Sequence, residues 1–164
     1  MPHTADTSPW RPFASLLLAM LLSSACIGMY AHDNRQHPIE AQYRQLSTLN
    51  AQSLLRYGET QTGIQADDRA LVAFNILMSR YSAQMERQDK YACAKAACHI
   101  GNIYYMRCSY SKAMEYFLTS LKLCEDNGFS DMIPRIYNMI GNVYSMFNDF
   151  ERSSMFYRKA LAVA

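Results

Sequence analysis

The sequence is poor in residues that interrupt helices, since its 164 residues include only 6 Gly and 5 Pro. It also lacks any block of like charge: 16 basic residues stand against 14 acidic ones, and charged residues make up 18% of the chain. A nucleic-acid-binding surface therefore has no electrostatic support. Because hydrophobic residues make up 50% of the chain, intrinsic disorder is excluded as its main state. The length indicates one domain or a short row of repeats.

Sequence motifs of common enzymes are absent as well. The chain contains no His-Glu-x-x-His, no Gly-rich phosphate loop and no Gly-x-Ser-x-Gly. Cys98 and His99 are adjacent, but neighbours on a helix point about 100° apart and do not form a nucleophile–base pair directly. Asp67 and Asp68 precede Ala70, where a helix begins, so N-terminal capping explains them. We therefore expect no enzymatic activity and no cofactor.

The cysteines do not have the spacing of a zinc site, in which two cysteines lie about two to four residues apart. No metal site is expected. Apart from Cys26, which lies in the N-terminal segment, the even number of cysteines permits disulfides in an exported chain. The favoured alternative is that they are buried small apolar residues. These four cysteines are Cys93, Cys98, Cys108 and Cys124.

An uncharged apolar run extends from Phe13 to Ala31 behind Arg11, in the order typical of an export signal. Three outcomes stay open: cleavage after Ala31, lipidation at Cys26 in a partial resemblance to a lipobox, or retention as a membrane span. As a helix the run would extend about 28 Å, just enough for a bilayer core. We expect residues 1–31 to be a signal peptide or membrane anchor, residues 32–39 to be a linker, and the protein to be exported, either periplasmic or membrane-anchored.

The chain repeats itself at an offset of 40 residues. Ile100-Gly101-Asn102-Ile103-Tyr104 aligns with Ile140-Gly141-Asn142-Val143-Tyr144, and the same offset aligns the helical pattern that follows each segment. A glycine inside a helix costs about 1 kcal/mol relative to alanine, so we expect the partner helix to approach closely there. Asn127-Gly128 is expected to end a helix and Pro134 to begin the next one.

These repeats resemble the tetratricopeptide repeat (TPR), whose pattern is Trp-x2-Leu-Gly-x2-Tyr followed by Ala-x3-Phe-x2-Ala. The residues that fill the pattern are Ala97, Ile100, Gly101, Tyr104, Ala113, Phe117 and Ser120 in one unit and Tyr137, Ile140, Gly141, Tyr144, Ser153, Tyr157 and Ala160 in the next. A weaker unit upstream contains Leu54, Tyr57, Gly58, Ala70, Phe74 and Leu77, with Gln61 in place of the expected Tyr. The 40-residue period resembles longer-looped bacterial members of the family.

The resemblance implies an all-α fold, a right-handed α-solenoid of antiparallel helix pairs. It covers residues 40–164, with units at about 51–84, 94–127 and 134–164. It also implies a concave groove built by the first helix of each pair. In related proteins an Asn at the place of Asn102 and Asn142 grips a peptide main chain, as an amide with one acceptor and two donors can. The alternative is that these Asn cap or bridge adjacent helices.

The groove is expected to bind a protein or peptide, with basic side chains adding a contact to a carboxylate. The expected peptide-binding residues are Lys95, Asn102, Tyr105, Arg135, Asn138 and Asn142. The chain is then an exported TPR scaffold, either the sensory part of a larger membrane-bound regulator, a stand-alone periplasmic lipoprotein adaptor, or a structural assembly protein. Residues 160–164 are expected to be helical and uncapped, which predicts a homodimer through the last helix or a further continuation of the chain.

Overall fold

The computed structural model describes residues 41–82 and 84–164. The chain divides into two units, Met1–Arg44 and Gln45–Ala164. Of the first unit only residues 41–44 are described, and they are helical. The expected signal segment, linker and lipidation site at Cys26 lie outside the described residues.

The helices of the second unit are α2 (Ala51–Gly63), α3 (Asp67–Ser79), α4 (Arg87–Met106), α5 (Tyr110–Asn127), the short 3-10 helix η1 (Ser130–Met132), α6 (Ile133–Met146) and α7 (Phe150–Ala162).

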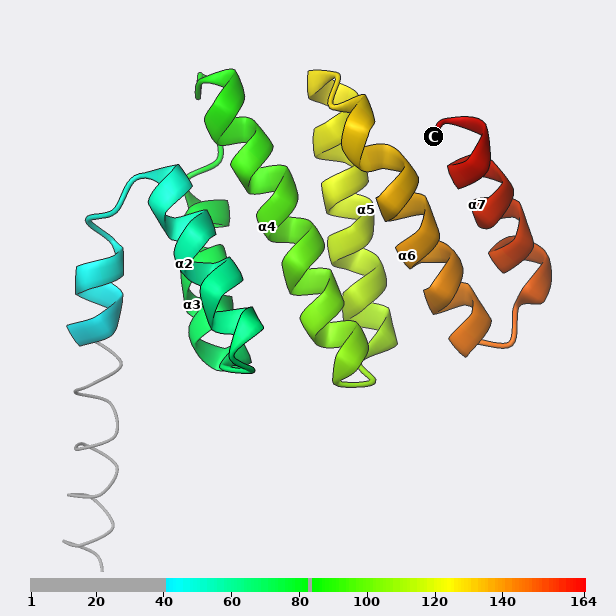
Figure 1. Cartoon of the computed structure of the whole chain (residues 1–164), viewed down its shortest axis with the longest axis horizontal. Helices are drawn as coiled ribbons and strands as arrows, with labels where there is room; N and C mark the ends of the chain where they lie inside the picture. The colour runs from blue at the N-terminus through cyan, green and yellow to red at the C-terminus, as the bar shows by residue number, and fades with distance from the viewer. Residues whose placement is uncertain (1–40, 83) are drawn as a thin grey trace, which may run out of the picture. The chain divides into compact units, whose positions relative to one another are not determined.

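The helices of the second unit form consecutive antiparallel pairs. Helix α2 packs on α3, α4 on α5 and α6 on α7, while α3 contacts α4 and α5 contacts α6 (Figure 1). The first helices of the pairs are also neighbours, because α4 contacts both α2 and α6. Each pair thus buries one face against the next, as stacked repeats do. The predicted all-α solenoid is confirmed.

A glycine in each first helix makes room for an aromatic ring of the second helix. A Cβ atom added to Gly101 would lie 2.7 Å from the ring of Phe117, and one added to Gly141 would lie 2.7 Å from the ring of Tyr157. The same contact joins Gly58 to Phe74, where the distance would be 2.2 Å. Such distances are shorter than van der Waals contact, so only glycine fits. The predicted close approach at these glycines is confirmed.

The predicted end of α5 and the predicted start of α6 are also confirmed. Gly128 follows α5 in the left-handed region with φ of 68°, where its backbone N–H bonds to carbonyls of the last turn. Pro134 lies in the first turn of α6, where no N–H donor is needed. At α3 the prediction was correct in place but not in detail: Asp67 and Asp68 lie in the first turn, while the N-cap residue is Ala66, which has no side-chain cap bond.

Three of the four described cysteines are buried small apolar residues, as the favoured interpretation predicted. Cys93 and Cys124 are fully buried and Cys98 is 4% exposed, whereas Cys108 is exposed at the turn between α4 and α5. All four are free thiols in this structure. None of the helices among residues 41–82 and 84–164 is long and apolar enough to cross a membrane.

Candidate peptide-binding groove

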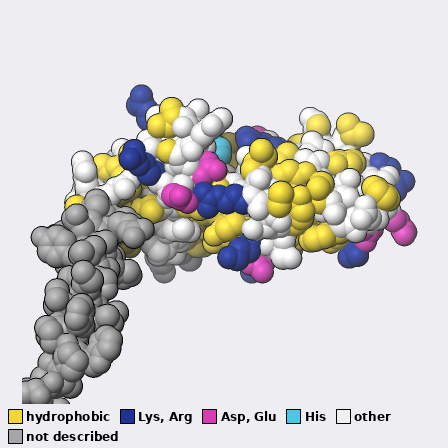
Figure 2. All heavy atoms as spheres, turned by 90° about the horizontal axis from the view of Figure 1, so that it is seen from below, with side chains coloured by type: hydrophobic (Ala, Val, Ile, Leu, Met, Phe, Trp, Pro, Cys, Tyr) yellow, Lys and Arg dark blue, Asp and Glu magenta, His cyan; other side chains and the backbone are white. Residues whose placement is uncertain are grey.

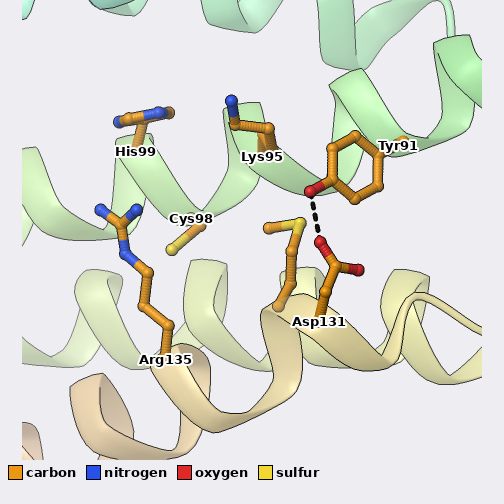
Figure 3. A pocket seen from close by; sticks show the side chains of 7 residues that line it. Tyr91, Lys95, Cys98, His99, Asp131 and Arg135 are labelled. Atoms are coloured by element: carbon orange, nitrogen blue, oxygen red, sulfur yellow. Dashed lines mark hydrogen bonds between the residues drawn. The ribbon is translucent and has the colours of Figure 1, made fainter.

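A pocket lies between α4 and α6, the first helices of two consecutive pairs. We call it the central pocket; its volume is about 170 Å³. In Figure 3, Tyr91, Lys95 and His99 line one wall from α4, and Asp131 and Arg135 face them from the opposite side. The lining residues are Tyr91, Lys95, Cys98, His99, Asp131, Met132 and Arg135. The structure therefore brings together Lys95 and Arg135, two residues that the sequence predicted to bind a ligand.

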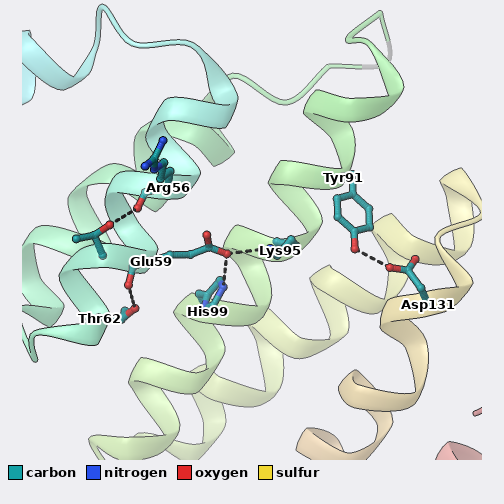
Figure 4. Close-up of polar contacts among 8 residues, drawn as sticks. Arg56, Glu59, Thr62, Tyr91, Lys95, His99 and Asp131 are labelled. Carbon is teal, nitrogen blue, oxygen red and sulfur yellow. Dashed lines mark hydrogen bonds and ion pairs between the residues drawn. The ribbon is translucent and has the colours of Figure 1, made fainter.

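Lys95 is not free in this pocket, because it is paired with a carboxylate from α2. Glu59 Oε1 lies 2.9 Å from Lys95 Nζ and 3.3 Å from His99 Nε2 (Figure 4). The His99 ring also stacks on Phe74, with 5.3 Å between ring centroids and 8° between planes. Arg135, in contrast, is exposed and has no carboxylate partner among residues 41–82 and 84–164.

Burial and charge act in opposite directions on the groups of this pocket. Burial lowers the pKa of His99; the carboxylate of Glu59 opposes this, while Arg135 and Lys95 add to it, and the net pKa lies below the ordinary value. For Glu59, burial would raise the pKa, but the hydrogen bond and charge of Lys95, together with His99, lower it. At neutral pH Glu59 is therefore ionised and His99 is neutral.

The next pocket along α4 shares a wall with the central pocket. We call it the Phe129 pocket; it has a volume of about 420 Å³ and is lined by Arg87, Gln88, Tyr91, Phe129 and Asp131. The Tyr91 hydroxyl donates to Asp131 Oδ2 at 2.6 Å, which raises the pKa of Tyr91 to about 12 and keeps it protonated. Tyr91 and Phe129 meet edge to face, and the Arg87 guanidinium lies over Phe129. This pocket offers rings and a planar cation to an apolar or aromatic side chain.

Asn102 and Asn142 are not equivalent, although they follow equivalent glycines. Asn142 Oδ1 accepts a hydrogen bond of 2.7 Å from the Tyr157 hydroxyl, a bridge between α6 and α7. At the corresponding place in the previous pair, Phe117 has no hydroxyl. Asn102 is exposed and lines a third pocket of about 370 Å³, which we call the Asn102 pocket, together with Thr62, Gln65, Asp67, Ile103 and Met106.

The two remaining predicted residues lie outside the central, Phe129 and Asn102 pockets. Tyr105 is half-buried, and its ring packs against Tyr110 with 5.6 Å between centroids. Asn138 is exposed on α6. Lys95, Arg135 and Asn102 thus line pockets, whereas the structure does not place Tyr105, Asn138 and Asn142 beside them in the same cavities.

Sequence reasoning missed Glu59 and His99 as groove residues, and it missed the Tyr91–Asp131 pair. A signal for Glu59 was present: it follows Gly58 as Asn102 follows Gly101, so extending the repeat alignment into the first unit assigns it to the groove. Tyr91 and Asp131 are separated by the same 40 residues as the repeats. His99 carried no signal beyond its helix, because its position depends on α2 and α3.

The face of the described region that Figure 2 draws carries side chains of both charges. On the face shown in Figure 2, acidic and basic side chains of the described region alternate with apolar ones and form no large field of one charge. Within residues 41–82 and 84–164, no three His, Cys, Asp or Glu side chains are grouped so that they could hold a metal ion.

The second unit is therefore a helical-repeat scaffold with pockets on the face of its first helices. Residues 91–164 match the family model of the tetratricopeptide repeat, so the resemblance that the sequence predicted is confirmed for this part of the chain. The crystal structure of the TPR domain of Arabidopsis FLU is similar, with a TM-score of 0.60 and 22% identity over 73% of this chain and 95% of that domain. At this identity the likeness shows the fold alone. No curated protein sequence matches the chain.

Proposed function

We propose that this protein binds a protein or peptide segment along the pockets of α2, α4 and α6. The observation that carries the proposal is Arg135, whose guanidinium lines the central pocket without a carboxylate partner among the described residues. A guanidinium pairs with a carboxylate through two parallel hydrogen bonds, so the pocket suits an acidic side chain or a chain terminus. TPR domains are typically non-catalytic interaction scaffolds, which agrees with a binding role.

Two further contacts define the kind of segment that fits. The exposed amide of Asn102 offers one acceptor and two donors, which matches a peptide unit of the ligand. The Phe129 pocket shares Tyr91 and Asp131 with the central pocket, so an apolar side chain of the same ligand reaches it without crossing a gap. We propose a segment that presents one carboxylate to Arg135 and a neighbouring apolar side chain to Phe129.

The test is to select binders from a library of random peptides against the full chain and label the best one as a reporter peptide. Loss of a charge-assisted hydrogen bond costs roughly 1.5–3 kcal/mol, so Arg135→Gln is expected to weaken binding of the reporter about ten- to a hundredfold in fluorescence polarisation. Arg158→Gln, which removes an exposed arginine from α7, is the matched control and should leave the affinity unchanged. Equal affinities of both variants would contradict the proposed role of Arg135, and a library without binders would contradict the function.

We also propose that the protein is exported and is either periplasmic or membrane-anchored, on the strength of the apolar run from Phe13 to Ala31. Cleavage, lipidation at Cys26 and retention as a span remain the three routes. Fractionation of cells that express the full chain tests this: we expect the protein in the exported fraction, with detergent needed to release it if it is lipidated or retained. A protein found only in the cytosolic fraction would contradict export.

A second role, as a self-assembling or structural component, is favoured by the exposed face of α7. Leu161 is 80% exposed and Phe150 is 64% exposed. The residue equivalent to Phe150 in the previous pair is Tyr110, whose ring meets Phe147 directly after the end of α6. The face that α6 covers on α5 thus has an uncovered counterpart on α7. The sensory part of a larger regulator and a stand-alone lipoprotein adaptor both agree with such a surface.

A further inference from the structure

Glu59 pairs a carboxylate of the chain itself with Lys95, which lines the central pocket together with Arg135. It reaches from α2 to Lys95 on α4, with 2.9 Å between Oε1 and Nζ, in the way that a ligand's carboxylate would (Figure 4). In the repeat alignment Glu59 stands where the other two units have Asn102 and Asn142. One unit therefore carries an acid at a place where the other two carry a neutral amide.

The same oxygen of Glu59 has a second partner that can change its charge. His99 Nε2 lies 3.3 Å from Oε1, and the ring is held in place by its stack on Phe74 from α3. A neutral imidazole offers the ionised Glu59 at most one N–H donor, whereas an imidazolium brings a full positive charge to that hydrogen bond. Protonation of His99 therefore gives Oε1 of Glu59 a second cationic partner beside Lys95 and adds a positive charge beside the central pocket.

We propose that Glu59 is the residue that determines specificity in this groove: it competes with the ligand's carboxylate for Lys95, and a proton on His99 removes the competition. This inference rests on the proposed peptide-binding function. The partner that fits is an acidic segment that binds more tightly in mildly acidic surroundings. At neutral pH the ligand's carboxylate has Arg135 alone, and after protonation of His99 it has both Arg135 and Lys95.

The charged groups that face His99 set the direction of the effect. They are Glu59 from α2, Lys95 on its own helix α4 and Arg135 from α6; Phe74 from α3 is apolar. Burial and the two cations keep the pKa of His99 below its ordinary value in the free protein. A bound carboxylate opposes the two cations and raises this pKa, so binding takes up a proton. Affinity therefore rises as the pH falls through the bound-state pKa and levels off below the free-state pKa.

The first experiment measures the affinity of the reporter peptide from about pH 8 to about pH 5. The gain for the unchanged protein is about tenfold for each unit by which the ligand raises the pKa of His99, and we expect roughly three- to tenfold in all. His99→Gln should abolish this gain. Glu59→Gln should bind more tightly than the unchanged protein at neutral pH, because Lys95 is then available.

A second experiment does not need the peptide. The titration of His99 is followed by NMR with sodium acetate as the probe and with sodium chloride at the same ionic strength. Acetate is expected to raise the pKa of His99, and Glu59→Gln is expected to lower it in chloride. A His99 titration that neither acetate nor Glu59→Gln shifts would overturn the inference.

The two proposals fail in different ways. Binding that depends on Arg135 but has the same pH profile in the unchanged protein, His99→Gln and Glu59→Gln would leave the peptide groove standing and remove the role of Glu59. A library without binders would remove the peptide groove, while the acetate titration would still decide whether Glu59 and His99 form a carboxylate-responsive pair.

Discussion

Three glycines govern how closely the two helices of each pair approach. Gly58, Gly101 and Gly141 each face an aromatic ring of the partner helix at a distance that leaves no room for a Cβ atom. The ring in turn fills the space that the absent side chain leaves, so the glycine and the ring form one packing unit. The loss of helix propensity at glycine, about 1 kcal/mol, is offset by this buried aromatic contact.

The first prediction at this scale is that Gly141→Leu destabilises the domain. A side chain at this position collides with Tyr157, and overpacking of this kind costs roughly 1–3 kcal/mol, so thermal unfolding should begin several degrees lower. Gly63→Ala is the matched control, since nothing lies within 4 Å of its added Cβ and alanine favours the helix. Circular dichroism on heating compares the two, and an unchanged Tm of Gly141→Leu would refute the close packing of Gly141 against Tyr157.

The repeat pattern predicts on which face of its helix a groove residue lies, but not which residue it pairs with. Lys95, Arg135 and Asn102 line pockets because the 3.6-residue period places them on the exposed face of their helices. Pairing was not predictable, because it depends on contacts between helices. The bond from Tyr157 to Asn142 and the Glu59–Lys95 pair both join residues of different helices, whose register the sequence pattern does not specify.

At the scale of whole helices, the boundaries with a glycine or proline signal were easier to predict than the start of α4. The end of α5 at Gly128 and the start of α6 near Pro134 follow from backbone chemistry and agree with the structure. Helix α4, however, begins at Arg87, whereas the repeat pattern placed the start of that unit at about residue 94. The pattern detects packing positions that recur, and the first turns of α4 have no α-helical counterpart, since residues 127–132 contain the end of α5, a turn and the 3-10 helix η1.

These additional turns of α4 have consequences for the site. They carry Arg87, Gln88 and Tyr91, three of the five residues of the Phe129 pocket. Arg87 also donates to the backbone carbonyls of Asn127 at 2.6 Å and Gly128 at 3.2 Å, and so satisfies acceptors at the end of α5. The Phe129 pocket therefore exists because α4 is longer than the repeat requires.

At the scale of the molecule, the solenoid follows from a pattern of apolar residues that recurs in each repeat. Each pair presents apolar side chains to the next, so the pattern of one unit predicts the contact between units. The all-α class and the tetratricopeptide repeats of residues 91–164 were therefore predictable, and the same rule identifies α7 as the helix whose outer face has no following pair in the described region. Leu161 corresponds to Leu121, which packs against the core from α5, yet Leu161 is 80% exposed.

The last prediction follows from this face of α7. If a second copy covers it, the protein forms a dimer whose population grows with concentration, and Leu161→Glu shifts it toward monomer because a charge would be buried in the contact. Leu118→Glu is the matched control, since it introduces the same charge at an exposed leucine of α5 (48% exposed) that lies on another helix.

Sedimentation velocity over a range of concentrations measures both variants and the unchanged chain in the same detergent. Because the apolar run at Phe13–Ala31 can itself promote association, the difference between the two variants carries the result. Equal sedimentation of all three proteins would show that Leu161 is not part of a contact between copies, and the face of α7 would then belong to a different partner.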